Sequence, residues 1–153
     1  MASSGSEDMY MAKNIGEFGR KVIIGLACKN RCVQIKRYYT EEEMARRNDD
    51  ITFSRIALHR DAIVKLLSNK EDIEDKLEQM EMGMNFLVDK IDIGWNNFVQ
   101  FDCEANVVHL RRFFSLGDEE LHPSRTGACL KIEEMYTLFT ELEQFLPMVE
   151  RAN

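Results

Sequence analysis

Basic and aromatic side chains stand next to each other in two short stretches of the sequence, Lys36–Tyr39 and Arg111–Phe114. Lysine and arginine can neutralise phosphates, and an aromatic ring can stack on a nucleic-acid base. The combination is typical of proteins that bind single-stranded nucleic acid. The alternative is a strand whose apolar residues point inward while these side chains coat a solvated face. We favour nucleic-acid binding because the combination occurs twice, although Phe113 and Phe114 are equally compatible with core positions.

Charge is distributed unevenly along the chain, which has a net charge of −7. Residues 20–37 contain six basic and no acidic side chains, whereas residues 71–92 contain eight acidic and two basic ones. Affinity for phosphates grows with the charge supplied. We therefore expect residues 20–37 to bind more strongly than the matching stretch around Arg111 and Arg112, where Asp102 and Glu104 offset the two arginines. The candidate nucleic-acid-binding residues are Arg20, Lys21, Lys29, Arg31, Lys36, Arg37, Tyr39, Arg111, Arg112 and Phe114.

Several other residues have two interpretations. The basic residues within 21–31 either form a rim for the same interface or protect an edge strand from pairing. Arg46–Arg47 and Arg55 either close over a bound strand or pair with the neighbouring Glu41–Glu43, and we favour the pairing. Trp95 is the only tryptophan. It could stack on a base, but a large aromatic residue at the start of a strand favours a core position.

The sequence contains no pattern typical of catalysis or of a metal site. Cys28 and Cys32 are close in sequence, but Cys103 and Cys129 do not form the second close pair that a zinc site needs. We expect four reduced thiols in apolar positions. The three histidines are scattered and none stands beside a nucleophile and an orienting acid. We therefore expect no enzymatic activity, no cofactor and no bound metal.

The composition predicts a folded, soluble protein. The chain has 153 residues, of which 44% are hydrophobic, enough for a core of one ordinary domain. No apolar run approaches the roughly 20 residues that span a bilayer, so we expect no membrane association. Residues 1–8 lack the basic start and apolar stretch of a secretory signal, which favours an intracellular location.

The sequence repeats itself. Residues 33–40 match residues 108–115 in chemical type at an offset of 75. Downstream, residues 58–66 match 130–138 at an offset of 72, and upstream Ile15-Gly16 matches the same pair at 93–94, at an offset of 78. Three ordered matches indicate a duplication, with the differences in length placed in the loops, where they are best tolerated.

The first copy predicts strands followed by a helix. Residues 21–40 form two β-rich stretches separated by a turn, which indicates a hairpin. Residues 40–50 are expected to be a charged loop, and 51–58 one or two short strands. Over residues 59–77 the apolar spacing becomes helical, with a kink or an interruption at Ser68-Asn69.

The second copy predicts the same order of elements. Residues 97–116 are expected to form a hairpin, 116–124 a loop, and 126–130 a short strand. Residues 133–149 have a broad apolar face at helical spacing. Pro147 is expected to disturb the last turn of that helix.

The order of these motifs resembles the single-stranded-DNA-binding domain of the positive cofactor four transcriptional coactivators. The second copy is the closer match, through Ile93-Gly94, Leu110–Phe114 and Gly127–Met135, and the first copy contributes Ile35–Tyr39. The resemblance implies four curved antiparallel strands and one helix in each copy. It also implies that the two copies pair through their helices, as separate domains do in that family, and that their grooved sheets bind single-stranded DNA with little sequence preference.

The resemblance also suggests roles for individual residues. Lys36 and Arg111 match a basic groove residue at the end of the second strand, and Tyr39 and Phe114 match an aromatic residue close behind it. We therefore expect an α+β fold made of two repeats of a curved antiparallel four-stranded sheet plus one helix, packed as an intramolecular pseudo-dimer. The expected organisation is a flexible N-terminal tail over 1–13, a first repeat over 14–80, a connector over 81–92 and a second repeat over 93–153.

The expected function is sequence-tolerant binding of single-stranded DNA in transcription or replication, in the nucleus and without catalysis. The alternative is a protein-interaction or scaffolding module that kept the fold and lost nucleic-acid binding, which the net charge of −7 favours. The expected partners are single-stranded DNA, transcription or replication proteins and a second copy of the chain. A cellular and a viral origin are both compatible with the sequence.

Overall fold

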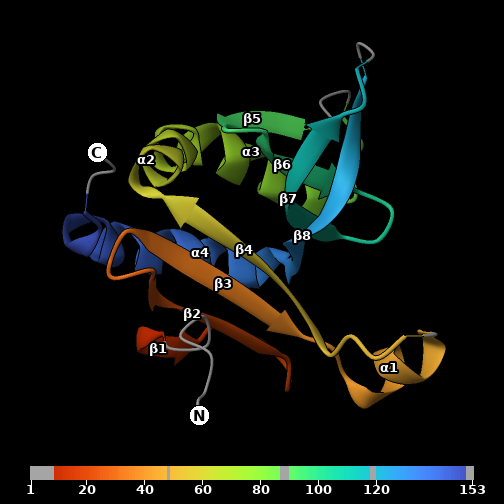
Figure 1. Ribbon diagram of the computed structural model, residues 1–153. Helices are drawn as coiled ribbons and strands as arrows, with labels where there is room; N and C mark the ends of the chain where they lie inside the picture. The colour runs from red at the N-terminus through yellow and green to blue at the C-terminus, as the bar shows by residue number, and fades with distance from the viewer. Residues whose placement is uncertain (1–8, 48, 87–89, 118–119, 151–153) are drawn as a thin grey trace.

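Two four-stranded antiparallel sheets and several helices make up the computed structural model of the chain, which describes residues 9–47, 49–86, 90–117 and 120–150 (Figure 1). The first sheet has the order β1-β2-β3-β4, with strands Tyr10–Asn14, Lys21–Ala27, Cys32–Tyr38 and Phe53–His59. The second has the order β5-β6-β7-β8, with strands Lys90–Gly94, Asn97–Asp102, Val107–Ser115 and Leu121–Lys131. The helices are α1 (Glu41–Arg46), α2 (Arg60–Ser68), α3 (Lys70–Glu81) and α4 (Ile132–Phe145), followed by the 3₁₀ turn η2 (Leu146–Met148). The prediction of an α+β fold with two four-stranded antiparallel sheets is confirmed.

The two sheets have the same strand register, which is consistent with a two-repeat arrangement. Val33 on β3 pairs with Leu58 on β4, and at offsets of 75 and 72 Val108 on β7 pairs with Leu130 on β8. The central hairpins also have loops of equal length, since Ala27 pairs with Cys32 in one and residue 102 with 107 in the other. The sequence match therefore extends to the pairing of strands.

Three elements lie where the sequence indicated none, and one of them is β5, which begins at Lys90 within the expected connector. Strand β1 begins at Tyr10, so residues 10–13 belong to the first sheet and not to a tail. Its residues are all exposed, so it carries no apolar alternation that could have revealed it. Within the expected charged loop, α1 forms because Thr40 and Glu43 make a capping box, in which each side chain binds the other residue's backbone N–H.

Of three further boundaries, two agree with the sequence and one differs from it. The first repeat has two long helices instead of one, because the chain breaks at Ser68-Asn69 as the sequence suggested, between α2 and α3. Strand β8 begins at Leu121 and takes up residues of the expected loop; Pro123 is tolerated there because β8 lies at the edge of its sheet. The prediction for Pro147 is confirmed, since the helix tightens into a 3₁₀ turn at this residue.

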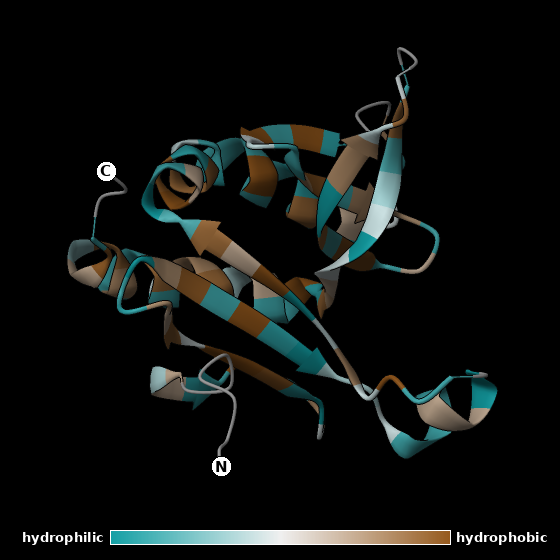
Figure 2. Ribbon diagram, in the orientation of Figure 1, coloured by the Kyte–Doolittle hydropathy of each residue, from teal (hydrophilic) through white to brown (hydrophobic). Residues whose placement is uncertain are grey.

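A single hydrophobic core joins the two halves of the chain. Strand alternation sends Val33 and Ile35 inward, as the banding of β3 in Figure 2 shows. In the same cluster, Ile63 of α2 and Phe139 of α4 are fully buried. In Figure 1 the first sheet lies below and the second above, and α2, α3 and α4 lie where the halves meet. None of the helices in the described ranges is long and apolar enough to cross a membrane.

A buried ion pair connects the turn between β1 and β2 to the start of α4. The carboxylate of Glu134 is fully buried and accepts hydrogen bonds from Arg20 Nε (2.8 Å) and Nη2 (3.0 Å). It also accepts bonds from the backbone N–H groups of Glu17 and Lys131, both at 2.8 Å. Arg20 Nη2 further donates to the carbonyl of Cys129 at 2.8 Å. These contacts tie the first sheet to the helix of the second repeat.

We predict that Arg20→Ala destabilises the protein far more than removal of a surface ion pair. Without Arg20 the buried carboxylate of Glu134 loses its charge partner, a loss that typically costs about 3–5 kcal/mol. The matched control is Lys13→Ala, which breaks a pair with Glu141 at 2.8 Å in which the lysine is 47% exposed. The control should cost about 0–1 kcal/mol. Urea unfolding measures both, and equal losses would contradict a structural role for Arg20.

Candidate nucleic-acid interface

The face of the first sheet that points away from the core carries three cations and two aromatic rings. Lys21, Tyr38 and Phe53 are direct neighbours across β2, β3 and β4. One row further along, Lys36 is the direct neighbour of Arg55. Residues that pair directly across antiparallel strands share a face. The five side chains therefore form one surface, which we call the outer face of the first sheet.

Cations and rings contact each other closely on this outer face. The ammonium of Lys21 lies 4.5 Å from the centroid of Tyr38, and that of Lys36 lies 4.3 Å from the centroid of Phe53. Arg55 approaches Phe53 at 5.9 Å, and the two rings are 5.6 Å apart. Lys36 is only 5% exposed, so its charge sits beneath the rings while Lys21 and Arg55 are open to solvent. The face therefore offers partly exposed rings surrounded by positive charge.

The N-terminal strand limits how far this open surface extends. A Cβ placed on Gly25 would lie 3.1 Å from the carbonyl oxygen of Tyr10 and 3.2 Å from the Cα of Ala12. The backbone of β1 thus lies over Gly25 on the outer face, which requires a residue without a side chain. Gln34, the partner of Gly25 on β3, is buried beside it. The accessible part of the face is consequently the end that carries Tyr38 and Phe53.

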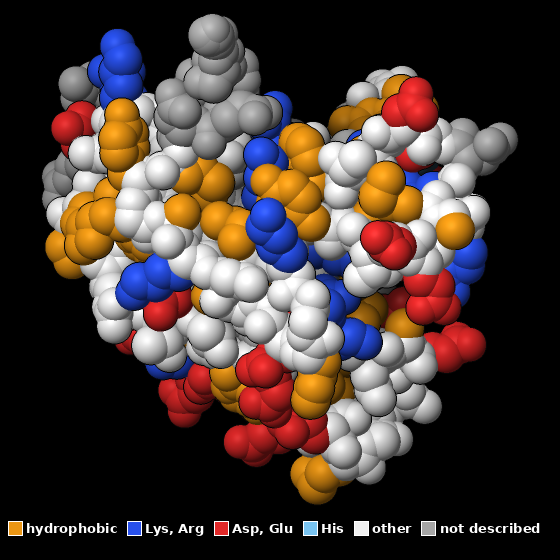
Figure 3. All heavy atoms as spheres, turned by 90° about the horizontal axis from the view of Figure 1, so that it is seen from below, with side chains coloured by type: hydrophobic (Ala, Val, Ile, Leu, Met, Phe, Trp, Pro, Cys, Tyr) orange, Lys and Arg blue, Asp and Glu red, His pale blue; other side chains and the backbone are white. Residues whose placement is uncertain are grey.

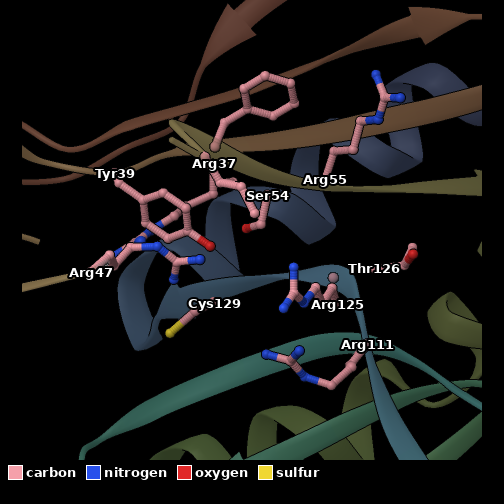
Figure 4. A pocket seen from close by; sticks show the side chains of 12 residues that line it. Arg37, Tyr39, Arg47, Ser54, Arg55, Arg111, Arg125, Thr126 and Cys129 are labelled. Carbon is pink, nitrogen blue, oxygen red and sulfur yellow. The ribbon is translucent and has the colours of Figure 1, made fainter. Parts of the chain in front are cut away.

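A cleft of about 530 Å³ lies between the edge of the first sheet and β8 of the second (Figure 4). Among the described residues, its lining includes five arginines and no carboxylate; the arginines are Arg37, Arg47, Arg55, Arg111 and Arg125. The other lining residues are Tyr39, Ile51, Phe53, Ser54, Thr126, Gly127 and Cys129. Phe53 and Arg55 belong both to this cleft and to the outer face, so the two surfaces are continuous. Figure 3 shows Lys and Arg side chains across the middle of the face seen from below, with Asp and Glu mostly along its lower and right-hand parts.

Only some of the arginines in the cleft are neutralised. Arg37 Nη2 donates to Glu43 at 2.5 Å, and Arg47 pairs with Asp49 at 3.0 Å. Arg111 Nη1 donates to a backbone carbonyl, that of Ser124, at 2.7 Å. Within the described residues, Arg55, Arg111 and Arg125 have no carboxylate partner at ion-pair distance. The cleft therefore carries an excess of positive charge.

Two titratable groups next to the cleft have shifted pKa values. Burial would raise the pKa of Glu43, but hydrogen bonds from Thr40 and Arg37 outweigh it and lower the pKa. Glu43 is therefore ionised at neutral pH and holds Arg37 while capping α1. Burial and the adjacent charge of Arg111 lower the pKa of His109. The imidazole is then neutral, so its Nδ1 can accept the hydrogen bond from Arg111 Nη2 at 3.1 Å.

The structure brings together half of the predicted site residues. Lys21 and Lys36 share the outer face, and Arg37, Tyr39 and Arg111 line the cleft. Tyr39 does not lie beside Lys36 as the sequence suggested. It follows the end of β3 and contacts Arg37 and Arg47, whose Cζ atoms lie 5.0 and 4.3 Å from its centroid. Tyr38 has the strand parity of Lys36 and takes the position beside it.

The remaining predicted residues lie elsewhere. Arg20 forms the buried ion pair with Glu134. Lys29 and Arg31 lie at the hairpin loop before β3, whereas the other end of β3 reaches the cleft. Two others are on β7 outside the cleft. Arg112 donates to Asn97 at 3.3 Å, and Phe114 contacts His122 with centroids 5.6 Å apart.

The sequence did not single out Phe53 or Arg125, and it assigned Arg47 and Arg55 to ion pairs with Glu41–Glu43. Arg47 pairs instead with Asp49, and Arg55 faces Phe53. Knowledge of the register between β3 and β4 would have placed Arg55 on the outer face, since it pairs directly with Lys36. The expectation of a core position for Trp95 is wrong: it is 53% exposed in the turn before β6. Phe18, in the corresponding turn of the first repeat, is 96% exposed.

The cysteines differ from one another in their surroundings. Cys28 is exposed, so the expectation that all four fill apolar positions is wrong for this residue. Cys32 is buried, and Cys103 and Cys129 are partly buried. Among the described residues, no group of three or more His, Cys, Asp or Glu side chains is arranged to hold a metal ion.

Comparison of the chain with protein-family models and with curated proteins gives no match in either case. Its function must therefore be inferred from the site itself, a cationic and aromatic sheet face that continues into an arginine-lined cleft.

We predict that the thiols react unequally with iodoacetamide at about pH 8. Burial, together with a hydrogen bond and charge from Cys28, raises the pKa of Cys32 to about 12, and burial also raises the pKa of Cys129. A raised pKa keeps these thiols protonated, and only the thiolate is an effective nucleophile. Exposed Cys28 should be alkylated while Cys32 and Cys129 stay intact. Peptide mass spectrometry measures this, with protein in urea as the control. Equal labelling of Cys28 and Cys32 in the native protein would contradict it.

Proposed function

We propose that the chain is a non-catalytic protein that binds single-stranded DNA with little sequence preference. The observation that carries this proposal is the continuity between the outer face of the first sheet and the arginine-lined cleft, through Phe53 and Arg55. Arginines at the rim neutralise phosphates, and the half-buried rings of Tyr38 and Phe53 stack on bases. Stacking is sequence-tolerant because every base has a π-face. From the family resemblance we assign this activity to transcription or replication in the nucleus.

We further propose that the two repeats act as the two subunits of a dimer joined in one chain. The shared hydrophobic core supports this arrangement, as do the contacts of each repeat with the helix of the other. The turn before β2 binds the start of α4, while β5 packs against α2. The cleft draws residues from both repeats, so DNA binding depends on their packing.

We predict salt-dependent binding of an oligonucleotide, measured by fluorescence anisotropy. For single strands the logarithm of the association constant falls with that of the salt concentration by about 0.7 per phosphate contact. The double variant Arg55→Gln with Arg125→Gln should bind more weakly and flatten this slope by about 0.7 for each phosphate that is no longer neutralised. Lys36 and Arg37 are less suitable targets because both are buried.

The matched control is the double variant Lys65→Gln with Lys70→Gln, which removes two positive charges from α2 and α3. It should leave the salt dependence of binding unchanged. A parent protein that shows no salt-dependent binding would overturn the proposal. The scaffolding alternative would then take its place.

We predict that Phe53→Leu weakens binding without changing the salt slope. Leucine keeps most of the apolar volume but has no π-face, so the loss of stacking should cost about 1–3 kcal/mol for each base concerned. Stacking releases no counterions, so the salt dependence should stay as it is in the parent. The comparison variant is Phe114→Leu, which the sequence favoured and which lies outside the cleft. A larger loss for Phe114→Leu would show that the second hairpin carries the stacking interactions.

A further inference from the structure

We propose that the arginine-lined cleft is a subsite for a phosphomonoester, and that the terminal phosphate of a DNA strand occupies it. This inference rests on the proposed binding of single-stranded DNA. It adds a preference for strand ends to a surface that otherwise binds any single strand. Three properties of the cleft support it: its charge, the donors that point into it and its size.

The charge of the cleft exceeds what a single phosphodiester needs. Five arginines line it, and Glu43 and Asp49 neutralise two of them from outside the lining. Of the other three, Arg55 turns away from the cleft, so among the described residues Arg111 and Arg125 supply two unneutralised positive charges to it. An internal phosphodiester carries one negative charge, whereas a terminal phosphate carries about 1.5 to 2 at neutral pH and has three free oxygens. The terminal group therefore matches this charge better.

One buried donor at the cleft lacks an acceptor. Arg37 is 5% exposed, and its Nε has no hydrogen-bond partner among the described residues although Nη2 binds Glu43. An unpaired buried donor costs free energy, and an anion that reaches it recovers that cost. Arg37 lines the cleft, so a phosphate oxygen entering from the cleft is a suitable acceptor.

Further donors reach the same space from both repeats. Figure 4 shows the guanidinium groups of Arg47, Arg111 and Arg125 and the hydroxyl of Tyr39 directed into the cleft, while Arg55 turns away towards the outer face. Arg47 and Tyr39 come from the first repeat, whereas the other two arginines come from β7 and β8 of the second. Guanidinium groups bind phosphate oxygens with charge-assisted, often paired hydrogen bonds.

The cleft is also large enough for more than a single ion. Its volume of about 530 Å³ lies in the range of sites for small organic ligands. Ile51 and Phe53 contribute apolar surface next to the arginines. The site can therefore hold a phosphate together with the sugar or base that carries it, and Phe53 connects it to the stacking surface for the following nucleotides.

The test compares oligonucleotides of one sequence at about pH 7.5: one with hydroxyl groups at both ends, one with a 5′-phosphate and one with a 3′-phosphate. At least one phosphorylated form should bind about tenfold more tightly than the hydroxyl form, as expected for one added set of charge-assisted hydrogen bonds. A hydroxyl-ended strand one nucleotide longer adds one ordinary phosphodiester charge, and it should bind less than about twofold more tightly.

Variants assign the preference to the cleft. Arg125→Gln should abolish the difference between phosphorylated and hydroxyl ends. The matched control Arg31→Gln removes the same charge at the opposite end of β3 and should keep the difference. If all oligonucleotides bind equally well, the subsite is wrong although the proposed function stands. If none binds, the proposed function fails. If only a free 5′-mononucleotide binds, raising the melting temperature in an Arg125-dependent way, the cleft takes a small phosphomonoester and the strand-end proposal is overturned.

Discussion

The buried carboxylate of Glu134 is the constraint on which the arrangement of the two repeats depends. Once α4 buries this charge, it must be paired, because an isolated buried carboxylate costs several kcal/mol. Its charged partner is Arg20, 114 positions earlier in the chain. The pair therefore brings the turn between β1 and β2 to the start of α4. Since Arg20 also binds the carbonyl of Cys129, a residue that lines the cleft, the same contact sets the distance between the first sheet and β8.

The corresponding contact in the other direction is not ionic, and this difference makes the repeats unequal. At the offset of 72 that relates the two copies, Glu134 corresponds to Ala62, which is buried and apolar. Strand β5 instead packs against α2, where a Cβ on Gly94 would lie 3.9 Å from the side chain of Lys65. The two halves of a single chain can differ in this way, since each contact occurs once in the molecule. Identical subunits would have to make every contact twice.

The outer faces of the two sheets show the same divergence. On the second sheet Phe98 and Phe113 meet edge to face with centroids 5.0 Å apart, and Lys90 lies 5.9 and 5.5 Å from their centroids. Among the described residues, one lysine thus contacts these two rings, where three cations contact the two rings of the first sheet. Two of the first repeat's cations, Lys36 and Arg37, are nearly buried. In a low-dielectric setting their charge acts more strongly on a nearby anion than it would in water.

Features that depend on neighbouring residues could be predicted from the sequence. The two central hairpins and α4 follow from local periodicity, and Ser68 and Pro147 marked a helix break and a helix end. Features that depend on distant residues could not. The exposed strand β1 has no apolar alternation, so only its pairing with β2 defines it. Whether Tyr38 or Tyr39 lies beside Lys36 depends on where β3 ends, because only residues two apart within a strand share a face.

The composition of the site was decided by tertiary structure for the same reason. The sequence indicated a basic and aromatic surface around β3, but the cleft takes Arg47, Arg55 and Arg125 from three other segments. The sequence also does not show which basic residues form internal ion pairs. Arg20 and Lys21 are adjacent and both cationic, but Arg20 pairs with the buried Glu134. Local patterns determine which way a side chain points from its own strand or helix. Packing between segments remote in sequence determines what that side chain faces, and so which cations are paired with a carboxylate and which line the cleft.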